Sequence, residues 1–130
     1  PRGGSIVNIS SLAGQRGSAN NTAYCAAKFG VNGVTQSLAK ELGTRGIRVN
    51  AVCPVYISTD GLLEALDEPN APPAGQPTDE YLADFAGSQT ALGVLPTAEE
   101  VAKACLYLAS DGASAITGQC INVDCGVFPR

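Results

Sequence analysis

Apolar positions along this chain follow two patterns, short β-branched runs and one long stretch with helical spacing. The runs at residues 5–11 and 47–53 are rich in Ile and Val and are bounded by Gly3-Gly4 and Pro54, which predicts two strands. Residues 22–42 between them predict a helix, and Gly43 follows as a stop signal. Its apolar residues at helical spacing are Ala27, Val31, Val34, Leu38 and Leu42. Because few positions in these strands are polar, the pattern predicts a right-handed βαβ unit from a parallel sheet covered on both faces, and the fold class is α/β.

The remaining elements are predicted from helix-capping residues, a short apolar run and the positions of proline. Thr97-Ala98-Glu99-Glu100 has the sequence of a capping box, which predicts the start of a helix that ends near residues 111–112. Residues 119–123 predict a last strand. Residues 58–92 are acidic and interrupted by four prolines, with a short helical pattern on either side, which predicts a mobile lid or excursion.

One face of the predicted long helix carries only small residues, namely Ala26, Gly30, Gly33 and Ser37. Glycine destabilises a helix interior by about 1 kcal/mol per position, so something is expected to approach this face closely. Small side chains let two helices pack backbone to backbone. The face therefore predicts either a contact with another subunit or a contact with a helix of the same chain.

Length and composition indicate the size of the domain and the environment in which it lies. The 130 residues, 45% of them apolar, suit one domain with a core. Only 15% are charged, against the usual ~25%, as expected if some surface packs against missing chain or another subunit. The chain starts at Pro1 and contains no Met, so we expect a processed product or a fragment. No apolar run approaches the ~20 residues of a membrane helix, and no signal-like segment precedes the fold, so we expect no membrane association and a cytoplasmic location.

Residue counts exclude several chemistries. The chain has no His, which excludes Ser-His-Asp and Cys-His catalysis and imidazole metal sites. Its five cysteines form no CxxC pair, so we expect them to be small, reduced core residues that bind no metal. They are Cys25, Cys53, Cys105, Cys120 and Cys125.

The charged residues are unevenly distributed along the chain. Residues 1–48 hold six basic residues and one acidic residue, whereas residues 49–102 hold nine acidic residues and no basic one. A solvated loop explains the acidic stretch, with cation or partner binding as the alternative, and no footprint of nucleic-acid binding is present.

Tyr24 and Lys28 are the pair most suggestive of chemistry. They are four residues apart near the start of the predicted helix, so their side chains share one face. A cation beside a phenol, at the positive end of a helix, stabilises the phenolate and makes Tyr24 a usable general acid or base, although an ordinary surface pair is the alternative. Ser11 ends the preceding strand, and because ligands bind at the carboxyl ends of parallel strands, we expect it to converge with Tyr24. A capping or loop serine is its alternative.

These residues lie within motifs that resemble the short-chain dehydrogenase/reductase family. Five segments match in family order: Ser5-Ile-Val-Asn-Ile-Ser-Ser-Leu-Ala-Gly14, Tyr24-Cys-Ala-Ala-Lys28, Ser37-Leu-Ala-Lys-Glu-Leu42, Ile47-Arg-Val-Asn-Ala-Val52, and Ile116-Thr-Gly-Gln119 with Asn122-Val-Asp124. The resemblance implies the C-terminal half of a Rossmann-like, doubly wound parallel sheet, with about three of the usual seven strands. Residues 1–130 would then be the C-terminal part of one dinucleotide-binding oxidoreductase domain, with residues 58–92 as the substrate lid and the N-terminal cofactor-binding half absent.

The resemblance also implies an NAD(P)-dependent oxidoreductase that interconverts a secondary alcohol and a ketone. By it, Tyr24 donates the proton, Ser11 hydrogen-bonds the same carbonyl oxygen, and Lys28 tunes Tyr24 and holds the nicotinamide ribose. The family's upstream catalytic asparagine has no counterpart here. A homodimer or homotetramer paired through the long helix is a further implication.

The segment after the second strand matches the family's cofactor contacts only in part. Pro54, Ile57 and Thr59 fit, whereas Val55 replaces the family's glycine and could lose backbone angles open only to glycine. Asp124-Cys125-Gly126 likewise replaces a common Asp-Gly-Gly. The glycine-rich turn that seats the pyrophosphate is absent, so NAD and NADP are equally open, and we expect these residues alone to bind neither tightly.

Two other functions fit the same residues. A non-catalytic subunit or binding module would keep the fold and the interface helix, and Val55 favours that interpretation. An epimerase or dehydratase acting through transient oxidation would use Ser11, Tyr24 and Lys28 unchanged. The substrate is a small alcohol or ketone, and sugars, polyols, steroids and acyl thioesters all remain open because the variable segment 58–92 determines the choice.

Overall fold

The two β-branched runs and the short run near the C-terminus form one parallel sheet. The computed structural model describes residues 3–130. Its strands are β1 (Gly4–Ile9), β2 (Ile47–Pro54) and β3 (Cys120–Val123), in the order β1-β2-β3. In the parallel register, Gly4 is opposite Ile47 and Ala51 is opposite Cys120. The predicted α/β class and three-stranded parallel sheet are confirmed.

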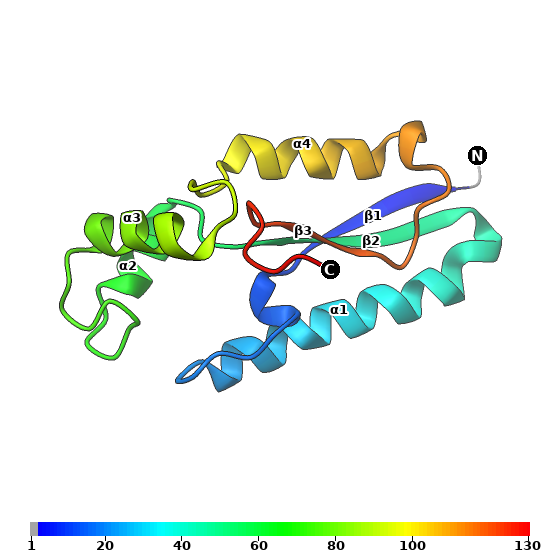
Figure 1. Ribbon diagram of the computed structural model, residues 1–130. Helices are drawn as coiled ribbons and strands as arrows, with labels where there is room; N and C mark the ends of the chain where they lie inside the picture. The colour runs from blue at the N-terminus through cyan, green and yellow to red at the C-terminus, as the bar shows by residue number, and fades with distance from the viewer. Residues whose placement is uncertain (1–2) are drawn as a thin grey trace.

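Helices cover both faces of this sheet. Helix α1 (Thr22–Leu42) lies on one face and α4 (Ala98–Ala109) on the other, so that β2 runs between them (Figure 1). The β2 segment Val49–Cys53 is completely buried, as expected for a central strand covered on both sides. On the α4 face, Val52 packs with Val101, Leu108 and Ala113 in the main apolar cluster.

Helix α4 begins with the predicted capping box. The Thr97 side-chain oxygen accepts a hydrogen bond from the Glu100 backbone N–H at 3.2 Å, and the Glu100 carboxylate accepts one from the Thr97 N–H at 2.8 Å. This hydrogen bond from the Thr97 backbone holds the pKa of the Glu100 carboxyl below its usual value. Two donors at the helix start are thereby satisfied, which fixes where α4 begins.

Helix α1 ends at Leu42 as predicted, but Gly43 does not reverse the chain. Gly43 keeps helical angles and begins a single 3₁₀ turn, η2 (Gly43–Arg45). The left-handed residue that turns the chain toward β2 is Gly46, with φ of 73°. A glycine is needed there because the conformation is costly for residues with a Cβ atom.

The apolar stripe of α1 is not the face that contacts the sheet. Val34 is 53% exposed, whereas the buried positions of the helix are Cys25, Asn32, Thr35 and Ala39. The buried face is partly polar because the sheet supplies a partner: the Asn8 side-chain amide of β1 donates to the Thr35 hydroxyl at 2.9 Å. Val31, Leu38 and Leu42 of the apolar stripe are half-buried at the edge of this contact, whereas Val34 and the predicted small-residue face around Gly33 are exposed.

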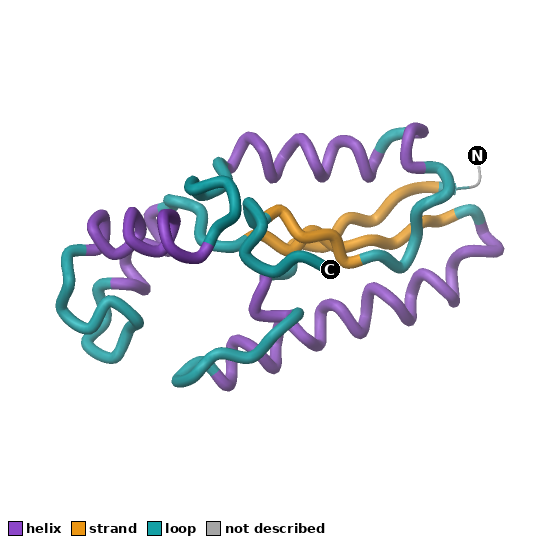
Figure 2. The backbone as a smooth tube through the Cα atoms, viewed as in Figure 1, coloured by secondary structure: helices purple, strands orange, loops and turns teal. Residues whose placement is uncertain are grey.

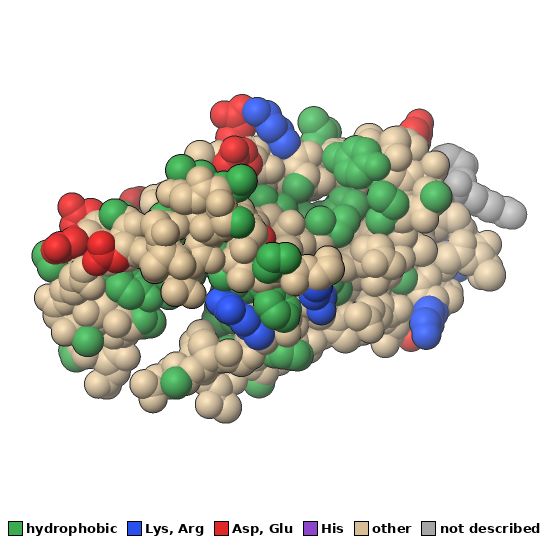
Figure 3. All heavy atoms as spheres, in the orientation of Figure 1, with side chains coloured by type: hydrophobic (Ala, Val, Ile, Leu, Met, Phe, Trp, Pro, Cys, Tyr) green, Lys and Arg blue, Asp and Glu red, His purple; other side chains and the backbone are tan. Residues whose placement is uncertain are grey.

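Residues 58–92, which we call the lid, lie beyond the carboxyl ends of the strands (Figure 1). They form two short helices, α2 (Asp60–Leu66) and α3 (Thr78–Gln89), joined by loops, as the short helical patterns predict (Figure 2). Leu66 and Leu82 are buried within it. Acidic side chains gather at the outer end of the lid and at the start of α4 (Figure 3). Within residues 3–130, no helix is long and apolar enough to cross a membrane.

Residues 124–130, which we call the C-terminal loop, fold around one buried carboxylate. The Asp124 oxygens accept from the backbone N–H groups of Gly126 at 3.0 Å and Phe128 at 2.9 Å. Cys125 between them has φ of 52°, in the left-handed region. Its carbonyl accepts from the backbone N–H groups of Ala91 and Leu92, which ties the end of the lid to the C-terminal loop.

Cys125 is therefore a strained position, and we expect Cys125→Gly to stabilise the fold. A residue with a Cβ atom loses roughly 1–2 kcal/mol in the left-handed conformation, so the substitution should raise the free energy of unfolding in urea by about 1 kcal/mol. Cys120→Gly is the matched control, since Cys120 lies in β3 and glycine weakens a strand interior. Destabilisation by both substitutions would contradict the strain at Cys125.

Candidate functional site

The predicted catalytic residues lie where β1 ends and the chain turns back into α1. Ser10 and Ser11 follow β1, and a single 3₁₀ turn, η1 (Leu12–Gly14), begins directly after them. The Ser11 side-chain oxygen caps this turn by accepting from the Ala13 backbone N–H at 3.1 Å. The capping role given as the alternative for Ser11 is thus present, and it fixes the hydroxyl at the carboxyl end of the sheet.

Lys28 connects the end of β1 with the ring of Tyr24. Its Nζ donates to the Ile9 backbone carbonyl at 3.1 Å and lies 5.7 Å from the centroid of the Tyr24 ring. Tyr24 is 46% exposed, so its hydroxyl can be approached from outside. The one-turn spacing therefore places a cation beside the phenol, at the carboxyl end of the same strand that Ser11 follows.

A close approach of η1 to α1 holds this arrangement. A Cβ atom on Gly14 would lie 2.7 Å from the Lys28 carbonyl oxygen and 2.8 Å from the Ser10 hydroxyl oxygen. The Asn32 side-chain amide donates to the Gly14 carbonyl at 2.9 Å, and the Ser10 hydroxyl donates to the Lys28 carbonyl at 3.3 Å. Only glycine fits at position 14 without displacing the helix that carries Tyr24 and Lys28.

Asn32 and Gln15 are two supporting residues that the sequence analysis did not identify. The buried Asn32 amide holds η1, while the Gln15 Nε2 donates to the Cys120 carbonyl and the Asn122 Oδ1, both at 3.1 Å. Gln15 thus fastens the turn after Ser11 to β3. The available signal for Asn32 was its place seven residues after Cys25 and seven before Ala39, on one face of the helix.

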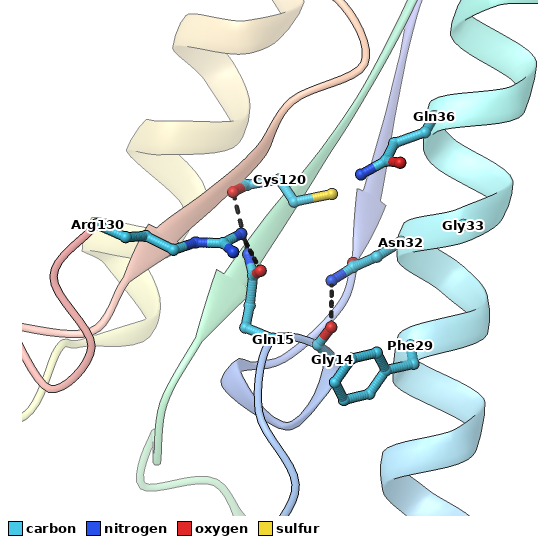
Figure 4. Close-up of a pocket in the computed structure, with 8 residues that line it drawn as sticks. All are labelled: Gly14, Gln15, Phe29, Asn32, Gly33, Gln36, Cys120 and Arg130. Atoms are coloured by element: carbon cyan, nitrogen blue, oxygen red, sulfur yellow. Dashed lines mark hydrogen bonds between the residues drawn. The ribbon is translucent and has the colours of Figure 1, made fainter.

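A pocket of about 310 Å³ lies between α1 and the C-terminal loop. Phe29, Asn32, Gly33 and Gln36 of α1 line it together with Gly14, Gln15, Cys120 and Arg130 (Figure 4). Ser11, Tyr24 and Lys28 do not line this pocket, so it is separate from the candidate catalytic residues. Burial raises the pKa of the Cys120 thiol on its wall, with the nearby Arg130 charge acting in the opposite direction.

The residues predicted to contact the cofactor lie at the end of β2 and directly after it. Pro54 is the buried last residue of β2, and Ile57 packs against the main apolar cluster. Thr59 caps α2, with its Oγ1 accepting from the Leu62 N–H at 3.3 Å. Val55 does not adopt the left-handed conformation, which among non-glycine residues 3–130 occurs only at Asn20, Ala74 and Cys125. The backbone here therefore follows a path that needs no glycine.

Tyr56 joins this segment to the lid. Its hydroxyl lies 3.2 Å from the Tyr81 hydroxyl of α3, and its ring packs edge-on against Phe85 with a centroid distance of 4.8 Å. Burial, followed by the hydrogen bond with Tyr81, raises the pKa of the Tyr56 phenol above its usual value. The phenol therefore stays neutral and keeps its hydrogen bond at physiological pH.

The cysteines are dispersed and unbridged. Cys25 and Cys53 are buried, while Cys105, Cys120 and Cys125 are half-buried, and all five are free thiols. Burial raises the pKa of the Cys105 and Cys125 thiols above the usual value. In the part of the chain that the structure describes, no group of three His, Cys, Asp or Glu side chains is arranged to hold a metal ion.

Comparisons with known proteins identify relatives of this chain. A family model described as enoyl-(acyl carrier protein) reductase matches residues 1–128. A 3-oxoacyl-[acyl-carrier-protein] reductase of Chlamydia trachomatis is 43% identical over 126 residues, which cover 97% of this chain and 46% of that protein. An acetoacetyl-CoA reductase of Rhizobium meliloti is 40% identical over 125 residues, 96% of this chain and 47% of that protein.

Solved structures give the same result for the fold. The crystal structure of a carveol dehydrogenase from Mycobacterium avium in complex with NAD superposes with a TM-score of 0.87 at 37% identity, covering 97% of this chain and 46% of that one. The chain thus spans about half the length of the relatives that it matches.

The close approach at Gly14 can be tested directly. We expect Gly14→Ala to lower the free energy of unfolding by about 2 kcal/mol, because the added methyl meets a backbone carbonyl and a buried amide that cannot move independently of α1. Gly17→Ala is the control, since nothing lies within 4 Å of a Cβ atom there, and it should change the value by less than about 0.5 kcal/mol. Equal effects in urea denaturation would show that the contact at Gly14 is not tight.

Proposed function

We propose that this chain, which belongs to the short-chain dehydrogenase/reductase family, forms the proton-transfer half of an NAD(P)-dependent oxidoreductase. The reaction is the interconversion of a secondary alcohol and a ketone. The observation that carries this proposal is the position of Lys28, whose ammonium donates to the Ile9 carbonyl at 3.1 Å and lies 5.7 Å from the centroid of the Tyr24 ring. No His exists in the chain to take the acid–base role in place of Tyr24.

In reduction, Tyr24 donates its hydroxyl proton to the carbonyl oxygen, where negative charge develops. Ser11 donates a hydrogen bond to the same oxygen, which stabilises that charge in the transition state. The Lys28 ammonium stabilises the phenolate that Tyr24 becomes after the proton has left. In oxidation, the phenolate accepts the proton of the alcohol, and the roles are reversed.

A bound nicotinamide cofactor would supply or accept the hydride at the carbonyl carbon. Lys28 fits such a group, because its ammonium has three N–H donors and, among residues 3–130, only one is used, on the Ile9 carbonyl. The remaining donors suit the ribose hydroxyls. We further propose Pro54, Val55, Ile57 and Thr59 as the cofactor-facing segment, which the likeness to a dehydrogenase in complex with NAD supports. NAD and NADP both remain candidates.

The substrate class we propose is a 3-oxoacyl thioester. The Chlamydia and Rhizobium relatives are both reductases whose names specify such a thioester, on acyl carrier protein in one case and on coenzyme A in the other. Steroids, sugars and polyols are less well supported by these relatives. In this proposal the lid, residues 58–92, encloses the acyl chain.

Residues 1–130 would supply only part of the oxidoreductase domain. The coverage of about half of each relative supports a second half that carries the pyrophosphate-binding turn. We propose a cytoplasmic location as well, which the five free thiols support, since a reducing compartment keeps thiols unbridged.

We propose a homodimer or homotetramer that pairs through α1. Ala26, Gly30, Gly33 and Ser37 form an exposed face, and nothing lies within 4 Å of a Cβ atom built on Gly30 or Gly33. Because no other helix of the described chain covers this face, it favours a contact with another subunit over a contact within the chain. It also permits backbone-to-backbone helix packing.

Replacement of Tyr24 tests the acid–base assignment. We expect Tyr24→Phe in the complete protein to lower the turnover number on a 3-oxoacyl thioester by at least about 100-fold, the scale of a lost general acid, while cofactor affinity is retained. Tyr107→Phe removes a hydroxyl that only bonds the Gly112 carbonyl on the far side of the sheet, and it should leave turnover unchanged. Full turnover by Tyr24→Phe would refute the proton-donor role.

Replacement of Gly33 tests the subunit contact. A leucine at this position should separate the two α1 helices, so light scattering of Gly33→Leu should give a lower molar mass than that of the unmodified protein. Gly87→Leu places the same side chain at an open helical position of the lid and should leave the mass unchanged. A monomeric unmodified protein would count against the interface.

A further inference from the structure

We propose that Arg16, Phe128 and Arg130 form an anion site that binds the phosphate of the arm carrying the acyl thioester. This inference rests on the proposed function, because it assigns a part of the same substrate to residues outside the candidate catalytic group. The three residues come from the loop after η1 and from the C-terminal loop.

The site is built around one aromatic ring. The guanidinium carbon of Arg16 lies 5.7 Å from the centroid of the Phe128 ring, and that of Arg130 lies 5.8 Å from it. The two positive charges are therefore at most about twice that distance apart. Stacking on a ring holds a guanidinium in one orientation with its N–H groups directed outward, which prepares it to bind an anion.

Neither charge is neutralised within the described part of the chain. The only ion pair among residues 3–130 joins Lys103 to Glu99 on α4. Asp124 is the acidic residue of the C-terminal loop, and both its oxygens are bonded to backbone N–H groups. Arg130 donates one hydrogen bond to the Gln15 Oε1. The Arg16 guanidinium makes no hydrogen bond to any of residues 3–130. Two like charges placed on one ring without a counterion favour an anion from outside.

The backbone of Phe128, whose ring lies near these charges, is held by hydrogen bonds on both sides. The Phe128 backbone N–H donates to Asp124 at 2.9 Å, and its carbonyl accepts from the Asn122 side-chain amide at 2.9 Å. Gln15, which accepts from Arg130, is itself bonded to the Cys120 carbonyl (Figure 4). The arrangement is therefore set by β3 and its neighbours rather than by solvent-exposed side chains alone.

This anion site lies next to the candidate catalytic residues along the chain. The Arg16 backbone N–H donates to the Leu12 carbonyl at 3.1 Å, so Arg16 closes the turn that Ser11 opens. Arg16 is five positions after Ser11, which limits the distance between their Cα atoms to about 18 Å. A ligand can therefore reach both Ser11 and the anion site if its reacting group and its charge are joined by a long flexible arm.

A phosphate fits this site better than a single carboxylate. Two guanidinium groups together offer more N–H donors than the two oxygens of one carboxylate can accept, and guanidinium binds phosphate oxygens in bidentate fashion. Acyl carrier protein and coenzyme A both present the acyl thioester on a phosphopantetheine arm, whose phosphate lies far from the thioester. The phosphate of this arm is therefore the ligand we assign, with free inorganic phosphate as the other source of the same chemistry.

The kinetic test compares thioesters with and without the phosphate in the complete protein. We expect Arg16→Gln to raise the KM for acetoacetyl-CoA at least about tenfold, the effect of losing one hydrogen bond to a charged group, with kcat unchanged. The KM for the acetoacetyl thioester of N-acetylcysteamine, which has no phosphate, should not change. Phe128→Leu keeps both charges but removes the ring, and it should raise the KM for acetoacetyl-CoA by a smaller factor.

Lys103→Gln is the control for net charge, since it removes one positive charge from α4 and should leave all KM values unchanged. An equal rise in KM for both thioesters in Arg16→Gln would overturn the proposal, because the arginine would then act on the thioester end or on the fold.

A binding measurement separates this inference from the proposed function. Titration calorimetry should give a Kd for pantetheine 4′-phosphate at least about tenfold lower than that for pantetheine, and Arg16→Gln should abolish the difference. This result does not require turnover, so a protein that reduces none of the thioesters would refute the proposed function while the anion site stands. Equal Kd values for the two compounds would refute the anion site, and binding of inorganic phosphate as tight as that of pantetheine 4′-phosphate would refute the carrier arm as its ligand.

Discussion

The approach of the η1 turn to helix α1 at Gly14 is the contact on which the rest of the site depends. Three polar atoms lie within 3 Å of the place where a Cβ atom would be, and two of them belong to residues of α1. Because no side chain separates them, the turn after β1 and the second turn of the helix share hydrogen bonds through Ser10, Lys28 and Asn32. Lys28 can then reach back to the Ile9 carbonyl while its own backbone supports the serine loop.

The elements of the fold were predictable because each has a strong local signal. The β-branched runs of β1 and β2, the capping box at Thr97 and the long helix from Thr22 all follow from residue types at short spacing. Tyr24 and Lys28 were predictable for the same reason, since their one-turn spacing is a local property. The expectation that Ser11 lies near them came from the topology, because the strand that Ser11 follows and the start of the helix meet at the same end of a parallel sheet. The shape of the turn between them could not be predicted.

The contacts that were not predictable join distant parts of the chain. Helix α1 buries Asn32 and Thr35 rather than its apolar stripe, because Asn8 of β1 and the Gly14 carbonyl offer polar partners that no local pattern reveals. Gln15 bonds to residues more than 100 positions away, at Cys120 and Asn122. Periodicity identifies which positions of a helix share a face, but the partner on the other side decides which face is buried.

Contacts with distant parts of the chain also hold the lid. Tyr56 follows the last residues of β2 and packs against Tyr81 and Phe85 of α3, so the segment proposed to face the cofactor is also the segment that holds the lid. At its other end the lid is tied to the C-terminal loop through the Cys125 carbonyl. The lid is therefore held at one end by Tyr56 and at the other by the C-terminal loop that also carries Phe128.

The apolar surface of the described residues explains the low charge content of the chain. Ile6 and Ile9 of the edge strand β1 are 39% and 52% exposed, and Phe29 and Val34 of α1 are 47% and 53% exposed. Exposed apolar residues and an unpaired strand edge favour aggregation unless another body covers them. Charged side chains on these stripes would prevent close packing, so their scarcity is a requirement of the contact. The scarcity of charge on these stripes is what the proposed subunit contact would require, and many of the acidic residues lie instead on the lid.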